Sequence, residues 1–185
     1  MSKARVLFKY WLPVGVWMLL IFCASSDTLS SAHTSRIIGP IVRWLAPNIS
    51  EVALERIVFR VRKCAHMVEY AMLAWLVWRA IRRQRRSAIR EWARPDSSRL
   101  EFNLQIAQNP AHFNEGTLKR ELQPWRWSEF GIAVLVVTLY GASDEFHQMF
   151  VKSRMASGWD VLIDACGGSL GLLLLWCHGR LRKKW

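Results

Sequence analysis

The feature that most constrains this chain is a long uncharged stretch near its N-terminus. Between Lys9 and Asp27 there are 17 consecutive uncharged residues, from Tyr10 to Ser26. A transmembrane helix needs about 20 predominantly apolar residues, so the stretch predicts a first membrane span over residues 10–26. A cleaved signal peptide is the alternative, because basic residues precede the stretch, but further apolar segments follow it.

Three further apolar segments predict three more spans, although each contains or adjoins charged residues. We expect these spans over residues 63–81, 128–148 and 159–178. The first of them contains His66 and Glu69, so its hydropathy alone also fits a soluble amphipathic helix. The expected fold class is nevertheless an all-α membrane protein, a bundle of four transmembrane helices.

Positive charge is distributed unevenly across this arrangement. Of the 26 Lys and Arg residues, 18 fall on one side of the four spans and eight on the other, with Lys63 counted on the poorer side and Arg79 on the richer side. Cytoplasmic loops carry an excess of Lys and Arg. Both termini and the segment 82–126 are therefore expected in the cytoplasm.

The expected spans divide the chain into three parts. Residues 1–81 and 127–185 form the two halves of one membrane domain, and residues 82–126 form a basic and polar cytoplasmic insertion between the second and third helices. We expect the Arg-rich run at residues 79–94 to lie against anionic lipid headgroups. Nucleic-acid binding is the rival interpretation of this run, but the fold context of such modules is lacking, so no nucleic-acid partner is expected.

The fourth span carries small residues that favour close packing of helices. Gly167 and Gly171 make a GxxxG pair, which lets a neighbouring backbone approach closely. Asp160 and Asp164 share one stripe of the same helix with small residues. Their carboxylates are therefore expected to point into the bundle and away from lipid.

Polar residues that are unusual in membrane spans gather near the outer ends of the expected helices. An ionised side chain at a bilayer centre costs about 2.5–3.5 kcal/mol on insertion scales, so such residues need partners or a watery pocket. We therefore expect one ligand-binding pocket that opens to the outer membrane face. Its predicted residues are Lys63, His66, Glu69, Tyr70, Asp144, Glu145, His147, Gln148, Arg154, Asp160 and Asp164.

Three functions stay open for this pocket. A non-catalytic envelope protein would bind an anionic lipid headgroup or a cell-wall precursor, with Lys63, His66 and Arg154 as the positive side. An intramembrane enzyme would act on a lipid-linked substrate by acid–base chemistry. Its candidate catalytic residues are His66, Asp144, Glu145 and His147. A structural scaffold would use the charges only to fix packing. Binding ranks first, because the sequence lacks a nucleophile elbow, a P-loop and a zincin motif.

Metal and cofactor chemistry receive less support from the sequence. The His, Asp and Glu residues of the pocket are of the types that make an oxygen and imidazole metal site, yet none has the fixed spacing of an HExxH helix. The four cysteines lie in apolar runs without CxxC or Cys/His ligand spacing, which disfavours a zinc module or a disulfide framework. No metal and no cofactor are expected.

Three stretches of the sequence match one known pattern. They are IFCASS at residues 21–26, KCAH at residues 63–66 with Tyr70 after it, and DEFHQMFVKSRMASGWDVLIDACGGSLG at residues 144–171. The last is the most specific, because DExHQxF is followed by an Arg, an Asp and a small-residue helix. In these stretches the chain resembles the VanZ family of bacterial membrane proteins, which is named for a teicoplanin-resistance accessory factor.

The resemblance implies a multi-pass protein of the bacterial cytoplasmic (inner) membrane, linked in some family members to reduced glycopeptide susceptibility. The implied partners are membrane lipids and a lipid-linked envelope precursor, and the oligomeric state stays open. The segment 82–126 is longer than the connection typical of the family. Lys152-Ser153 stands where the family often has Pro-Gly, and Asp164 adds a charge where Asn is common.

Overall fold

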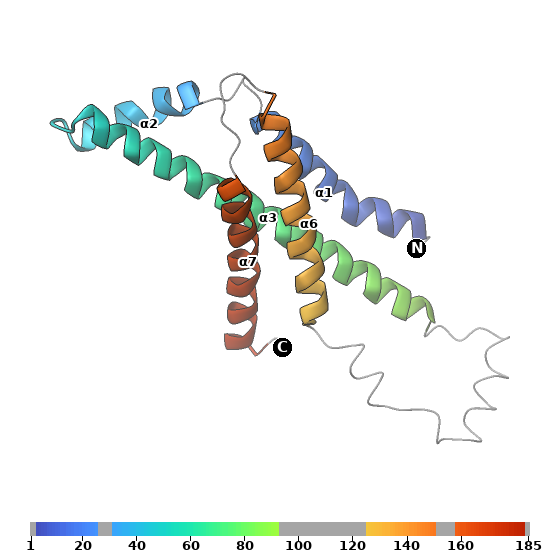
Figure 1. Cartoon of the computed structure of the whole chain (residues 1–185). Coiled ribbons are helices and arrows are strands. Elements are labelled where there is room, and N and C mark those ends of the chain that lie inside the picture. Colours follow the sequence, from blue (N-terminus) through green and yellow to red (C-terminus); the bar gives the residue numbers. More distant parts are fainter. Residues whose placement is uncertain (1–2, 26–30, 93–124, 151–157, 184–185) are drawn as a thin grey trace, which may run out of the picture.

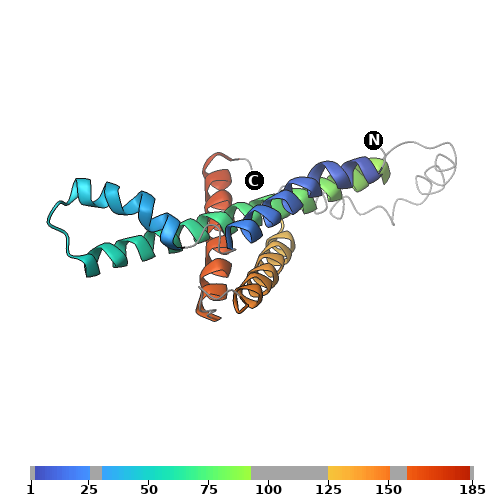
Figure 2. The ribbon, with the colours of Figure 1, turned by 90° about the horizontal axis from the view of Figure 1, so that it is seen from above.

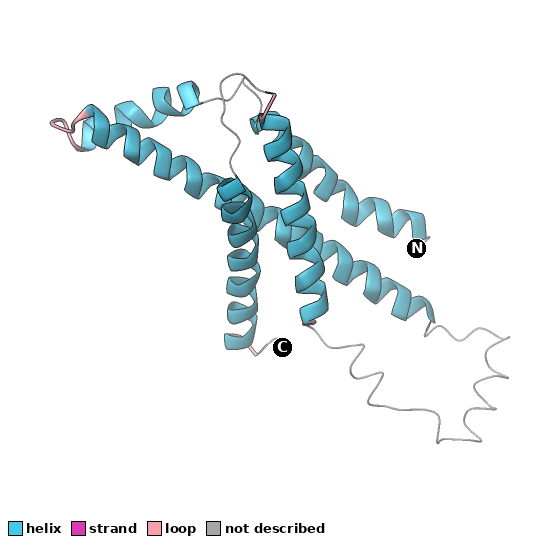
Figure 3. Ribbon diagram, viewed as in Figure 1, coloured by secondary structure: helices cyan, strands magenta, loops and turns pink. Residues whose placement is uncertain are grey.

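A computed structural model describes residues 3–25, 31–92, 125–150 and 158–183 of the chain. Within these ranges all regular structure is helical, as the cyan ribbons of Figure 3 show, and there is no strand. The five helices are α1 (Lys3–Ser25), α2 (Ser31–Leu45), α3 (Glu51–Trp92), α6 (Trp127–Gln148) and α7 (Gly158–Leu181). The expected all-α class is confirmed.

The long helix α3 organises the other four. It runs across the whole molecule in Figure 1, and α1, α2, α6 and α7 each pack against it. Seen from above in Figure 2, α1 lies along the C-terminal half of α3, α2 folds back along its N-terminal half, and α7 crosses near its middle. Within the described residues α2 contacts only α3.

α3 is longer than the sequence predicted, because the expected span 63–81 is only its central part. The helix has 42 residues, which corresponds to about 63 Å at 1.5 Å per residue. It contains neither Gly nor Pro, the residues that most disfavour a helix interior. The Arg-rich start of the expected insertion is therefore helical as far as Trp92, and residues 93–124 lie outside the described residues.

Two segments are long and apolar enough to cross a membrane, namely Phe8–Ser25 of α1 and the whole of α7. In the described part of the chain α3 and α6, which hold the expected second and third spans, do not meet that criterion. Large apolar side chains are nevertheless exposed on α6 as on α1 and α7, and Leu19, Leu139 and Leu174 are each more than 60% exposed. Four spans and their orientation stay predictions.

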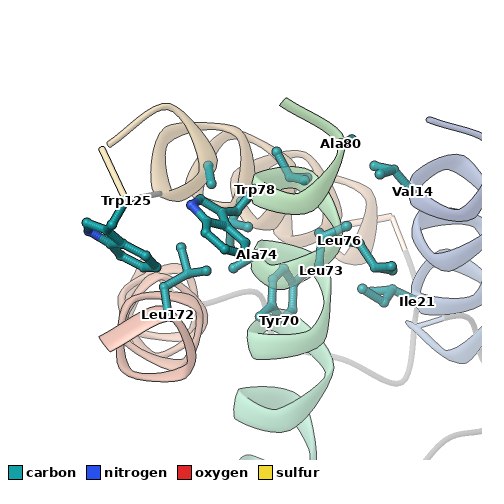
Figure 4. Close-up of a cluster of buried hydrophobic side chains, with 13 residues drawn as sticks. Val14, Ile21, Tyr70, Leu73, Ala74, Leu76, Trp78, Ala80, Trp125 and Leu172 are labelled. Atoms are coloured by element: carbon teal, nitrogen blue, oxygen red, sulfur yellow. The ribbon is translucent and has the colours of Figure 1, made fainter. Parts of the chain in front are cut away.

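The apolar core lies where α3 meets α1, α6 and α7. Tyr70 and Leu73 of α3, Val137 of α6 and Leu172 of α7 have no exposed surface. Figure 4 shows the α3 side chains between Leu172 on one side and Ile21 of α1 on the other. Since Tyr70 carries a hydroxyl into this core, it links the apolar packing to the polar site described below.

The two glycines of the GxxxG pair are points of very close approach between α7 and α3. A Cβ atom on Gly167 would lie 2.7 Å from the Cα and the carbonyl oxygen of Met67, and one on Gly171 would lie 2.6 Å from the Cβ of Ala71. A larger side chain at either position requires the neighbouring helix to shift. The predicted close packing of this helix is confirmed, and it brings Asp164 of the same helix against α3.

Candidate ligand-binding site

Asp144, near the end of α6, is the centre of a buried hydrogen-bond cluster. Its Oδ2 accepts hydrogen bonds from the Ser25 hydroxyl at 2.6 Å, from the Gln148 amide nitrogen at 2.8 Å and from the Tyr70 hydroxyl at 3.5 Å. None of these four side chains is more than 5% exposed. Because Ser25 ends α1 and Tyr70 belongs to α3, three helices meet at one carboxylate.

The carboxylate of Asp164 lies at the same junction. Oδ1 of Asp144 is buried and has no hydrogen-bond partner in the described part of the chain. One turn earlier on α6, a Cβ atom on Gly141 would lie 3.5 Å from Oδ2 of Asp164 and 3.5 Å from a ring carbon of Tyr70. Asp164 itself is only 4% exposed. The carboxylate junction, as we call it, consists of Ser25, Tyr70, Asp144, Gln148 and Asp164.

Two pairs of ionisable side chains lie beyond the carboxylate junction on α3 and α7 and are more exposed. The ammonium of Lys63 on α3 lies 2.5 Å from a carboxylate oxygen of Asp160 on α7. On α3 the Nδ1 of His66 lies 3.6 Å from Oε2 of Glu69, which is longer than a direct hydrogen bond. Asp160 precedes Asp164 by one helical turn and is more exposed than Asp164. We therefore call Lys63 and Asp160 the rim pair. The predicted positive side of the pocket is thus partly neutralised by carboxylates.

The remaining predicted residues have different surroundings. Glu145 is buried next to Asp144 on α6. The ring of His147 lies 4.4 Å from the ring of Phe22 on α1, so this histidine packs on an aromatic side chain. Arg154 lies outside the described residues. Ser25 was absent from the predicted set, although its motif IFCASS was recognised, because an uncharged serine at the end of an apolar run is a weaker sign of a polar site than an ionisable residue.

A second buried polar group lies at the opposite end of α6. Oε1 of Glu129 is 2.7 Å from Nε of Arg85 on α3, and both side chains are largely buried. Beside them the guanidinium of Arg82 lies 4.9 Å from the centre of the Trp78 ring, which in turn lies 5.1 Å from that of Trp125. Burial, with help from nearby guanidinium groups, lowers the pKa of Arg82 to about 10. Indoles of this kind favour the membrane–water interface.

Chemically, the carboxylate junction is rich in acceptors. An ionised carboxylate offers about four lone-pair sites and no donor. Three donors of the protein already converge on one oxygen of Asp144. Its other oxygen has no hydrogen-bond partner in the described residues, and Asp164 adds a second buried carboxyl group.

Comparison with known proteins identifies one family. The family model described as VanZ/LLP1 matches residues 10–179, nearly the whole chain. The match includes the carboxylate junction, the rim pair and the segment between α3 and α6, and it confirms the resemblance inferred from the three motifs. No curated protein and no solved structure matches this chain.

Proposed function

This chain belongs to the VanZ/LLP1 family, and on that premise we propose that it binds the headgroup of an envelope lipid or of a lipid-linked cell-wall precursor. Family membership supports a VanZ-like protein of the cell envelope. The proposed site is the carboxylate junction together with the rim pair, His66 and Arg154. The proposed location is the bacterial cytoplasmic membrane, with the site open to its outer face.

The proposal includes four membrane spans, namely α1, residues 63–81 of α3, α6 and α7, with both termini inside. The apolarity criterion does not favour α6, which contains Glu129, Asp144 and Glu145. All three side chains are at most 8% exposed, so they lie against other parts of the protein. Acidic residues that point into a bundle are the usual ionisable residues of membrane spans, which supports counting α6 as a span.

The observation that carries the binding proposal is the buried carboxylate of Asp144. In a purely structural network nearly every buried polar atom has a partner. Here one oxygen receives donors from three side chains, whereas Oδ1 has none in the described residues. An open buried acceptor favours a ligand over a scaffold. No comparable observation favours an enzyme.

Lipid binding to the purified full-length protein in detergent tests the proposal. Native mass spectrometry would compare phosphatidylglycerol, phosphatidylethanolamine and a polyprenyl-diphosphate-linked precursor. We expect at least one of them to bind, and we expect Lys63→Met to weaken its binding. The matched control is Arg56→Met, which removes an exposed cation from the same helix. Equal binding by Lys63→Met, Arg56→Met and the unchanged protein would contradict the proposed site.

A cellular readout complements the binding experiment. By analogy with other members of the family, deletion or overexpression is expected to alter glycopeptide susceptibility. Lys63→Met should then lose the phenotype while the protein still accumulates in the membrane, and Arg56→Met should keep it. Loss of the phenotype in both variants at normal protein levels would point to an effect other than this site.

A further inference from the structure

We infer that the carboxylate junction holds the primary ammonium group of an aminophospholipid headgroup between Asp144 and Asp164. The inference rests on the proposed function and specifies the ligand. It concerns the buried end of the headgroup, which lies against α3, α6 and α7. The phosphate of the same headgroup would lie at the rim pair.

The charge balance of the carboxylate junction favours a cationic ligand. Asp144 and Asp164 are 3% and 4% exposed, and none of the ion pairs in the described part of the chain joins either of them to a cation. The ammonium of Lys63 is already 2.5 Å from a carboxylate oxygen of Asp160. Two buried carboxyl groups without a cationic partner in the described residues favour a cationic ligand, because an uncompensated charge inside a protein is costly.

The hydrogen-bonding capacity of the carboxylate junction favours a primary ammonium group. Oδ2 of Asp144 receives donors from Ser25, Tyr70 and Gln148, and Oδ1 is buried without one in the described residues. A primary ammonium has three N–H donors and no acceptor. It can therefore donate to Oδ1 of Asp144 and to the carboxylate of Asp164 at once, whereas the trimethylammonium of phosphatidylcholine has no N–H donor.

The position of the carboxylate junction along the helices favours a lipid as the source of the ammonium group. Ser25 is the last residue of α1 and Gln148 is the last residue of α6, so the junction lies at the helix ends, where headgroups are expected. The rim pair is about a quarter exposed. The Lys63 ammonium has three N–H donors, so besides Asp160 it can contact the phosphate that accompanies the ammonium in an aminophospholipid.

The experiment compares phosphatidylethanolamine with phosphatidylcholine of identical acyl chains, bound to the full-length protein in detergent and counted by native mass spectrometry. We expect the unchanged protein to prefer phosphatidylethanolamine by about tenfold, because charge-assisted hydrogen bonds are among the stronger ones. Asp144→Asn and Asp164→Asn should each remove most of this preference. Glu55→Gln, which neutralises an exposed carboxylate on α3, is the control and should keep it.

A glycine substitution gives an independent test that does not change charge. Gly141→Ala would place a methyl group 3.5 Å from Oδ2 of Asp164, an ordinary contact distance, so the protein should fold while the approach of a donor is obstructed. We expect Gly141→Ala to lower the preference for phosphatidylethanolamine. Gly131→Ala, with nothing within 4 Å of the added atom, should leave it unchanged.

The other outcomes separate this inference from the proposed function. If phosphatidylglycerol binds in a Lys63-dependent manner but the two matched lipids bind equally, the ammonium assignment is wrong and the proposed function stands. If no headgroup binds in a Lys63-dependent manner, both are wrong. If sodium or potassium ions abolish the preference in the unchanged protein, an inorganic cation occupies the junction. A preference that persists in folded Asp164→Asn also overturns the inference.

Discussion

The hydroxyl of Ser25 donates a 2.6 Å hydrogen bond to Oδ2 of Asp144, across 119 positions of sequence. The bond joins the end of α1 to the end of α6, two helices that both pack against α3. A second bond between the same helices runs from the Tyr140 hydroxyl to the carbonyl oxygen of Met18 at 2.5 Å. Together they fix the register of α1 against α6 and so hold the carboxylate junction in place.

Removal of the Ser25 hydroxyl should destabilise the protein. Ser25→Ala leaves a buried carboxylate with one donor fewer, for which a loss of roughly 1–3 kcal/mol is typical. Ser169→Ala is the matched control, because the Ser169 hydroxyl bonds only the carbonyl oxygen of Ala165 on its own helix in the described residues, an interaction of little benefit to a helix. Thermal unfolding in detergent should show a lower Tm for Ser25→Ala alone, and equal values would contradict the expectation.

The glycines of α7 give a second stability prediction. Gly167→Ala would bring a methyl group to 2.7 Å from the backbone of Met67, and overpacking of this kind costs roughly 1–3 kcal/mol. Gly131→Ala on α6 meets nothing within 4 Å and should be neutral or slightly stabilising, since Ala is the better helix former. Thermal unfolding of the two variants measures the difference. A Tm for Gly167→Ala as high as that of Gly131→Ala would mean that α7 and α3 are less closely packed.

Two ion pairs of equal length should differ in their contribution to stability. Arg85 and Glu129 lie 2.7 Å apart and are largely buried, whereas Arg43 and Glu51 lie 2.7 Å apart and are more than half exposed. Glu129→Gln leaves a buried guanidinium without its counter-charge, which typically costs about 3–5 kcal/mol. Glu51→Gln should cost less than about 1 kcal/mol, because water screens an exposed pair. Unfolding in detergent at low and high salt compares them, and only Glu51→Gln is expected to approach the unchanged protein.

The sequence predicted those meetings of residues that follow from helical spacing and from the order of the helices. Tyr70, Asp144, Gln148 and Asp164 were assigned to one end of three different helices, and the structure brings these four together. The small residues of α7 were also expected to admit a close neighbour. These features follow from periodicity, since residues three or four apart share a face whatever the helix packs against.

Contacts that depend on how one helix is rotated against another were beyond the sequence. Lys63 was a candidate partner for several acids, and only the crossing of α3 and α7 selects Asp160. The length of α3 and the existence of α2 were missed for a related reason. Charged and apolar residues alternate without a clear limit in residues 51–92 and 31–45, and tertiary packing decides where such helices end.

Membrane orientation is predicted by the distribution of Lys and Arg and is checked by cysteine labelling in intact cells. The four native cysteines lie at exposed positions, so they are first replaced by alanine. A cysteine at position 31 should react with an impermeant maleimide, because the segment after α1 is expected outside. A cysteine at position 97 should react only after the cells are opened, because the segment after α3 is expected inside. Labelling of position 97 in intact cells would overturn the four-span arrangement.

Substitutions of the rim pair can show whether these two residues have a structural role or a binding role. Lys63 and Asp160 join α3 to α7, and both are about a quarter exposed. Lys63→Met alone leaves Asp160 without its counter-charge and should lower stability by roughly 1–3 kcal/mol, less than for a fully buried pair.

The double variant Lys63→Met with Asp160→Leu separates the two roles of this pair. It should recover the Tm of the unchanged protein, because replacement of both partners by apolar residues is often neutral. If Lys63 also binds the phosphate of a headgroup, the recovered protein should still bind phosphatidylglycerol about tenfold more weakly, through loss of a charge-assisted hydrogen bond. Native mass spectrometry on the same samples measures this. Recovery of both Tm and lipid binding would mean that the pair only joins the helices and that the headgroup contacts other residues.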